Sequence, residues 1–113
     1  MELQYSELDT GVRIIKLSGK LDLNGTYAVE VDFVRHCTGT NLRVIVDLSK
    51  VNYLSSIGIP MLINSAKLVI RNGGKMALLN PQKAVADVLK ITGIPLIIPI
   101  YESMYTAVTE ISK

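Results

Sequence analysis

The sequence predicts an α/β fold: a small single domain over residues 1–113, with a mixed, mostly parallel sheet of about five strands and about four helices. Short apolar runs rich in β-branched residues alternate with longer segments whose apolar residues recur at helical spacing. Glycine, asparagine or proline separates these segments. A hydrophobic fraction of 49% in 113 residues is enough to form a core. The alternation favours parallel pairing with right-handed crossovers.

The first two strands are predicted to form an antiparallel hairpin. Residues Leu3–Glu7 and Val12–Ser18 have strand-like composition, and the turn-forming sequence Asp9-Thr10-Gly11 separates them. We expect the chain to leave the sheet in the segment Gly19–Asp22.

The first helix is expected to begin at a capping side chain, either Asn24 or Thr26, and to stop at Gly39. Its predicted inward face consists of apolar residues at helical spacing, namely Tyr27, Val31, Val34 and Cys37.

A strand over 42–48 follows, and its nearly continuous apolar composition predicts that both of its faces are covered. Asp47 then falls near the end of this strand, and Asp22 lies where the chain enters the first helix. Carboxyl ends of parallel strands often form the functional edge of a sheet. Each carboxylate either caps its own loop or helps to shape a partner surface.

The second helix is predicted to begin at Ser56 or Ile57, which places Pro60 in its first turn, where proline is tolerated. It ends at Asn72-Gly73-Gly74. Its core stripe is Ile59, Leu62, Ile63, Ala66, Val69 and Ile70. The opposite face carries Met61, Asn64, Ser65 and Leu68. That face either forms an exposed patch or is covered by another element of the domain.

The last third of the chain predicts two more strands and two more helices. A strand covers Lys75–Leu79, Pro81 opens the third helix and Thr92-Gly93 closes it. A strand over Leu96–Tyr101 should be short or at the sheet edge, because Pro99 cannot donate to a ladder. A final helix covers Glu102–Lys113. The inward residues of these helices are predicted to be Ala84, Val85, Val88 and Leu89, then Met104, Ala107, Val108 and Ile111.

Composition argues against several functional classes. A net charge of +2, with scattered basic residues, does not indicate nucleic-acid binding. No apolar run approaches the ~20 residues of a membrane span, and the first residues lack signal-peptide character, so we expect a cytoplasmic protein. The single cysteine, Cys37, excludes an internal disulfide and is either a small core residue or a reactive thiol.

Enzyme signatures are scarce. The sequence lacks nucleotide-binding and nucleophile-elbow motifs, and His36 is the only histidine, without a serine or carboxylate at a telling spacing. We therefore expect no catalytic residues, no metal site and no cofactor. Gly73-Gly74 is interpreted as a helix stop in preference to a phosphate loop.

Ser55 and Ser56 stand out because they fall at the predicted start of the second helix. A helix start carries unpaired backbone N–H groups and the positive end of the helix dipole. The two hydroxyls therefore either cap the helix or are presented to a kinase, in which case the N–H groups would hold the phosphate.

Four segments in order resemble the STAS family, which is named for sulfate transporters and anti-sigma factor antagonists. Ser18–Asp22 resembles the family's segment before the first helix, and Val46–Leu54 its strand and following loop. Ser55–Ile59 occupies the place of the family's Asp-Ser-Ser-Gly-Leu. Asn72–Leu78 resembles its helix stop and next strand.

The resemblance implies a non-enzymatic regulatory domain of the anti-sigma factor antagonist type. Its partner would be an anti-sigma factor with serine kinase activity, and a phosphatase would reverse the phosphorylation. The phosphorylation candidates are Ser56 and Ser55. The expected partner-binding residues are Asp22, Asn24, Ser55, Ser56, Ile57, Gly58 and Met61.

The sequence departs from the family pattern at the decisive position. Aligned on Gly58 without a gap, the phosphorylated serine falls on Ile57, which cannot accept phosphate. Ser56 then acts as a displaced acceptor, or the partner is bound without phosphorylation control, or both serines only cap the helix. An alternative from the same resemblance is an accessory subunit of a lipid or anion transporter, or a module that binds a small ligand or nucleotide. An edge strand also permits a dimer.

Overall fold

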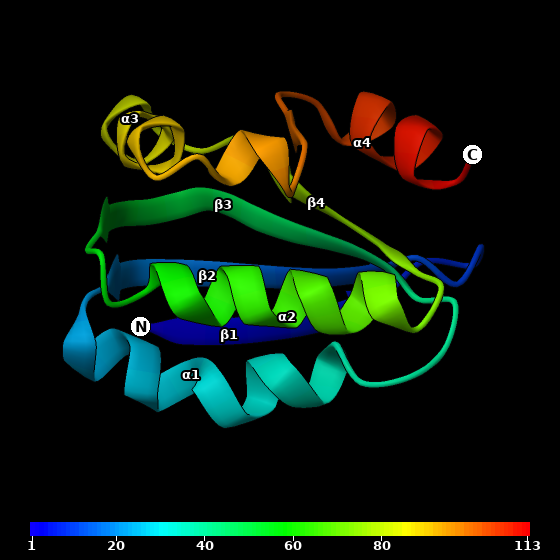
Figure 1. The fold of residues 1–113 in the computed structure, drawn as a ribbon, viewed down its shortest axis with the longest axis horizontal. Coiled ribbons are helices and arrows are strands. Elements are labelled where there is room, and N and C mark those ends of the chain that lie inside the picture. The colour runs from blue at the N-terminus through cyan, green and yellow to red at the C-terminus, as the bar shows by residue number, and fades with distance from the viewer.

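The computed structural model describes all 113 residues and contains five strands, four α-helices and one 3-10 helix. Figure 1 shows α1 and α2 running side by side along the sheet, with α3 and α4 across the other side of the view. In chain order the elements are β1 (Glu2–Glu7), β2 (Arg13–Leu21), α1 (Leu23–His36), β3 (Arg43–Leu54), α2 (Ile59–Arg71), β4 (Lys75–Leu79), α3 (Lys83–Ile91), η1 (Ile94–Leu96), β5 (Ile100–Tyr101) and α4 (Met104–Ile111).

The strands lie in the order β1-β2-β3-β4-β5, so the sheet grows by one neighbour at each step along the chain. β1 and β2 are antiparallel, and every later pair is parallel. The predicted hairpin and mixed, mostly parallel sheet are therefore confirmed. The turn between β1 and β2 needs Gly11, whose φ of 89° lies in the left-handed region.

The two faces of the sheet contribute residues to two separate hydrophobic clusters. Alternation along β3 sends Val44 and Val46 to one face and Ile45 to the other. The larger cluster joins the first face to α1, α2 and α3, and the smaller one joins the second face to Ala107 and Ile111 of α4. Both faces are covered, as the apolar composition of β3 predicted.

Two strands are longer than the sequence suggested. β2 continues to Leu21, and β3 runs to Leu54 instead of ending near 48. Two one-residue irregularities in β3 let its polar second half pair with the end of β2. Asp47 consequently lies within β3, where its carboxylate accepts a hydrogen bond from the N–H of Ser49, and not at a strand end.

The predicted inward face of α1 is wrong except at Cys37. Tyr27 and Val31 are 68% and 75% exposed, and Val34 is also exposed. Gly25, Thr26, Val29 and Phe33 face the sheet instead. The reason is steric, because a side chain at Gly25 would overlap the carbonyl oxygen of Lys20. Small residues on this face let the start of α1 approach the end of β2, and Phe33 fills the space further along.

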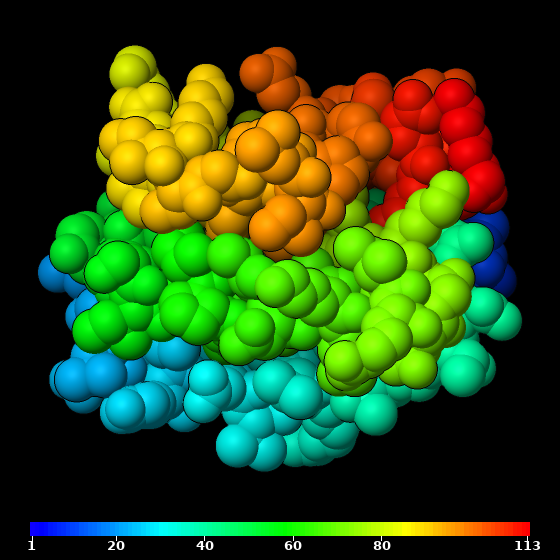
Figure 2. Space-filling model, viewed as in Figure 1, coloured from blue at the N-terminus to red at the C-terminus, as the bar shows by residue number.

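The core stripe of α2 is confirmed at Ile59, Leu62, Ala66 and Val69, whereas Ile70 is half exposed. Met61 and Ser65 are buried, so of the two alternatives for this face, coverage by another element holds at these residues. In the space-filling view, α2 runs across the molecule between α1 and the segment of α3 and η1, so only its outward face meets solvent (Figure 2).

The last strand has only two residues, Ile100 and Tyr101, and forms the sheet edge beside β4. Pro99 predicted that the strand would be short or at the edge, and it is both. Of the preceding residues predicted as strand, Leu96 ends the 3-10 helix η1 and residues 97–99 form an irregular turn. α3 buries Val85 and Leu89 but leaves Ala84 exposed, and in α4 Met104 is exposed instead of inward. Thr92 and Gly93 close α3 as predicted.

Candidate functional site

The turn between β3 and α2 lies beside the start of α1, because β2 and β3 are parallel and end at the same edge of the sheet. The N–H of Ser55 donates to the carbonyl oxygen of Leu21 at 3.1 Å, and the Ser55 hydroxyl donates to the same oxygen at 3.3 Å. The fold thus brings together the segment Leu21–Asn24 and the turn Ser55–Gly58. We refer to these two segments as the serine edge.

Ser55 is half-buried and holds the turn together. Its side-chain oxygen accepts a hydrogen bond from the N–H of Ile57 at 3.3 Å, and its carbonyl oxygen accepts one from the N–H of Gly58 at 3.1 Å. Its hydroxyl is also bonded to Leu21, so the N–H, the carbonyl oxygen and the hydroxyl of Ser55 all have partners inside the protein. Ser55 is therefore a structural residue of the turn.

The start of α2 differs from the prediction. The helix begins at Ile59, not at Ser56 or Ile57, and its cap residue, Gly58, has no side chain. The N–H of Ile59 donates to the carbonyl oxygen of Ser56 at 3.4 Å, and Pro60 has no N–H. Together with the bonds made by Ile57 and Gly58, this leaves no free amide from 57 to 60. The expected cradle of N–H groups for a phosphate is absent from these positions.

Gly58 is buried and fits closely against the ends of both strands. A Cβ atom there would lie 2.8 Å from Cγ of Leu21 and 3.1 Å from Cδ1 of Leu54. Both leucines belong to the larger core cluster. Only glycine lets the turn rest on these side chains without displacing them, so Gly58 shapes the serine edge from beneath.

Ser56 and Ile57 point away from the core. Ser56 is exposed and its hydroxyl, unlike that of Ser55, has no hydrogen-bond partner in the chain. Ile57 is 46% exposed. Tyr53 at the end of β3 and Leu23 at the start of α1 are also large exposed apolar residues. Sequence reasoning did not identify these two, although a strand that pairs as far as Leu54 places Tyr53 outward by simple alternation.

Asp22 is the cap of α1, in place of the predicted Asn24 or Thr26. Its carboxylate accepts a hydrogen bond from the N–H of Gly25 at 2.8 Å. Asn24 is exposed, and with Asp22 and Lys20 it lines an open hollow of about 430 Å³. Met61 is buried and does not reach this surface.

The remaining candidate residues lie elsewhere. His36, at the end of α1, stacks on Tyr5 with 3.9 Å between ring centroids. Its side chain is therefore partly covered and does not lie fully in solvent. Burial and the nearby Arg35 and Arg13 guanidinium groups lower the pKa of His36. Cys37 is fully buried, and that burial raises the pKa of its thiol to about 12, as expected for a core residue.

Groups that define other classes of site are missing. No three histidine, cysteine, aspartate or glutamate side chains gather where they could hold a metal ion. None of the helices has the length and apolar character needed to cross a bilayer. Gly73, with a φ of 84°, and Gly74 terminate α2, as the sequence predicted.

The fold and the serine edge define a small mixed α/β domain with an exposed hydroxyl on the turn before its second helix. The model of the STAS domain matches residues 6–107, and the chain belongs to the STAS family. The chain is 29% identical to a protein of Paenibacillus polymyxa named anti-sigma F factor antagonist, over 98% of this chain and 97% of that protein.

Solved structures agree with the fold. A STAS domain protein from Planctomyces limnophilus superposes with a TM-score of 0.87 at 18% identity, over 98% of each chain. The anti-sigma factor antagonist SpoIIAA in its unphosphorylated form gives 0.78 at 17% identity, over 98% of this chain and 96% of that one. The murine anion transporter Slc26a9 gives 0.73 at 19% identity, over 90% of this chain but only 18% of the transporter.

Proposed function

We propose that this chain is a non-enzymatic regulatory domain of the anti-sigma factor antagonist type, which binds an anti-sigma factor with serine kinase activity through the serine edge. One observation carries the proposal: the Ser56 hydroxyl is exposed and unbonded beside the exposed side chain of Ile57, whereas Ser55 is held inside the turn. The name of the Paenibacillus polymyxa relative, which aligns over nearly the whole chain, supports the same function.

The segments that meet at this edge carry large exposed apolar side chains. Ile57, Tyr53 and Leu23 are 46%, 50% and 44% exposed, and they come from the segments that meet at this edge. Large apolar and aromatic side chains supply much of the energy of protein interfaces. Asn24 and Asp22 add hydrogen-bonding groups at the rim, where both line the open hollow. Gly58 is buried and holds the turn in place from below.

Ser56 is the proposed phosphoryl acceptor, one residue before the position that the family uses. Both Ser56 and Ile57 protrude from the same turn, so the displacement moves the hydroxyl along an exposed segment and does not bury it. A phosphate at Ser56 would not be captured by the amides of Ile57, Gly58 and Ile59, because these are bonded within the turn, and Pro60 has no N–H. It would act at the interface by adding charge and volume, and a phosphatase would restore binding.

A calorimetric titration with a purified anti-sigma factor that has serine kinase activity tests the proposal. The unmodified chain should bind, and Ser56→Asp should bind at least about tenfold more weakly, because a charge would be buried without a partner. Ser56→Ala should bind within about twofold. The matched control is Thr109→Asp, which adds the same charge at an exposed position of α4. Absence of binding by the unmodified chain contradicts the function, and equal weakening by both aspartates contradicts the site.

Intact-mass measurement tests the phosphorylation step separately. After incubation with ATP and the kinase, the unmodified chain and Ser55→Ala should gain one phosphate, and Ser56→Ala should gain none. A gain that persists in Ser56→Ala assigns the acceptor elsewhere. Binding without any gain identifies a constitutive antagonist and contradicts the switch.

The likeness to part of the murine anion transporter Slc26a9 supports a second candidate, an accessory domain of a transporter. Capture experiments with tagged chain distinguish the two candidates. Retention of a transporter ATPase that survives Ser56→Asp favours the second, and retention of an anti-sigma factor favours the first.

A further inference from the structure

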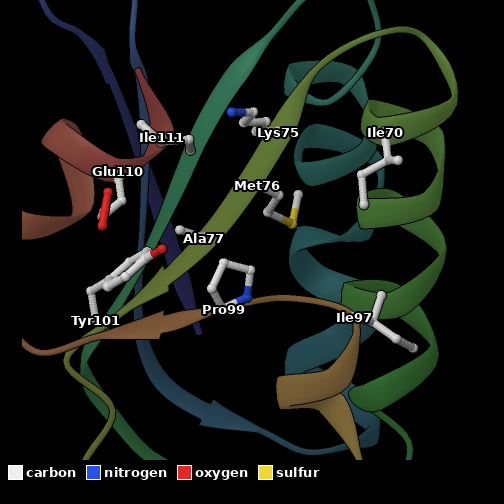
Figure 3. A pocket seen from close by; sticks show the side chains of 9 residues that line it. All are labelled: Ile70, Lys75, Met76, Ala77, Ile97, Pro99, Tyr101, Glu110 and Ile111. Atoms are coloured by element: carbon white, nitrogen blue, oxygen red, sulfur yellow. The ribbon is translucent and has the colours of Figure 1, made fainter. Parts of the chain in front are cut away.

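A cavity of about 250 Å³ lies at the β5 side of β4, between α2 and α4, away from the serine edge. Figure 3 shows its walls: Met76 and Ala77 from β4, Ile70 from α2, Pro99 and Tyr101 from the last strand region, and Ile111 from α4. Most of this lining is apolar. A cavity of this kind is suited to aliphatic groups.

The main chain of β4 is open where it borders this cavity. The N–H of Lys75 donates to Leu42 on the β3 side, and the N–H of Leu78 donates to Pro99 on the β5 side. Because main-chain groups alternate between the two sides of a strand, the N–H and C=O of Met76 face the β5 side. β5 pairs only with Leu78 and Leu79, so it does not reach Met76.

Pro99 explains why β5 stops. With Leu78 opposite Ile100, the parallel register would assign the N–H of residue 99 to the carbonyl oxygen of Met76. Proline has no N–H. The chain before it turns away instead, and the N–H of Ile98 bonds to the carbonyl oxygen of Ile94 at 2.8 Å. Because residues 97–99 do not form a strand, the N–H and C=O of Met76 stay open beside an apolar cavity.

The charges at the rim are already paired within the chain. The Lys75 ammonium donates to the main-chain oxygen of Lys113 at 2.6 Å, and the Lys113 ammonium lies 2.7 Å from the Glu110 carboxylate. The cavity consequently matches an uncharged occupant. The free edge strand of a second copy is a poor match, because β1 carries Glu2 and Glu7.

We propose that the β4 edge and its cavity form a docking site for an extended, uncharged peptide segment of a partner protein. The segment would pair its main chain with Met76 and place an aliphatic side chain among Ile70, Ile97 and Ile111. This is the addition of a strand to an open sheet edge. The site is independent of Ser56, so contact here would persist when the serine edge is phosphorylated.

Amide hydrogen exchange tests the open edge directly. In the free chain, the amide of Met76 should exchange at least about tenfold faster than that of Leu78, which is bonded to Pro99. A short capped peptide of alternating valine and threonine should slow Met76 and leave Lys75, which faces β3, unchanged. Equal protection of Met76 and Leu78 in the free chain overturns the proposal.

Two variants test the cavity with the same peptide. Ile70→Glu should weaken binding at least about tenfold, because a charge enters an apolar wall. Pro99→Val should also weaken it, since valine restores the N–H that lets β5 close the edge. The matched control is Leu96→Glu, at a residue that is 93% exposed and does not line the cavity.

Peptide binding that tolerates Ile70→Glu, or no binding at saturating peptide, overturns the proposal. Sedimentation of the free chain tests whether a second copy of the chain occupies the site. A monomer at all concentrations supports a partner peptide, and a dimer lost in Ile70→Glu but kept in Leu96→Glu would assign the edge to a second copy instead.

Discussion

Gly58 and Leu21 are in such close contact that a single added carbon would not fit between them. A Cβ atom on Gly58 would stand 2.8 Å from Cγ and 2.9 Å from Cδ2 of Leu21. Leu21 is the last residue of β2, and Gly58 is the last residue before α2. This contact therefore fixes the distance of the turn Ser55–Gly58 from the sheet, and with it the position of Ser56.

Gly58→Ala should lower the free energy of unfolding by about 1–2 kcal/mol, because Leu21 and Leu54 are buried and have little room to move. Urea denaturation measures the change. In the double variant with Leu21→Ala, the space left by leucine accommodates the new methyl group. The double variant should therefore lose less stability than the sum of the two single variants, by at least ~0.5 kcal/mol. Strict additivity would mean that the two residues are not in contact.

The two serines should differ in their effect on stability. Ser55→Ala removes the hydroxyl bonds to Leu21 and Ile57 and should cost about 1 kcal/mol. Ser56→Ala removes no internal bond and should change stability by less than ~0.5 kcal/mol. Thermal unfolding of the pair decides the assignment, since equal losses would contradict separate roles for the two hydroxyls.

The sequence predicted the hairpin, the helix order and the edge position of the last strand, because these depend on local patterns. It failed where packing decides. The polar second half of β3 looks like a loop, and its pairing with β2 depends on two irregularities that no local pattern reveals. The buried face of α1 depends on the close approach of Gly25 to Lys20, which is a tertiary contact.

At the candidate site, the sequence located the serine turn but not the roles within it. Ser55 and Ser56 are chemically identical in the sequence, and only the position of Leu21 makes one structural and the other free. The open amides expected at the helix start are not found at 57 to 60. Ile57, Gly58 and Ile59 donate their N–H groups within the turn, and Pro60 has none. Met61 was misplaced because a helix packed between neighbours buries more than one stripe.

His36 should make stability depend on pH below neutrality. Its folded-state pKa is lowered from 6.5 by burial and then by Arg35 and Arg13, whereas Asp32 acts in the opposite direction. The unfolded chain therefore binds the proton more readily than the folded chain. The free energy of unfolding keeps its full His36 contribution above about pH 6.5 and decreases as the pH drops below that value. Urea midpoints at ~pH 7.5 and ~pH 5.5 measure the loss.

His36→Gln is the comparison for this pH dependence. Glutamine does not titrate, so the variant should lose less stability over the same interval. Carboxylates that titrate at lower pH act equally on both proteins and cancel in the difference. Identical midpoint shifts in the two proteins would contradict the assignment to His36.

Cys37 should react with thiol reagents only when the protein opens. The side chain is fully buried, and burial raises the pKa of the thiol to about 12. At ~pH 8 the folded chain therefore presents almost no thiolate, whereas an unfolded cysteine is partly ionised. Ellman's reagent should modify the native chain at a rate set by opening, and mild urea should raise that rate in step with the unfolded fraction.

An exposed cysteine in the same fold provides the reference rate for this reaction. Ser6→Cys in a Cys37→Ala background places the thiol on the exposed strand β1 and should react at least about a hundredfold faster than Cys37. Cys37→Ala itself should cost about 1–2 kcal/mol, because it leaves space in the larger core cluster beside α1. If Cys37 reacts as fast as Cys at position 6 under native conditions, the end of α1 opens locally and the thiol is accessible after all.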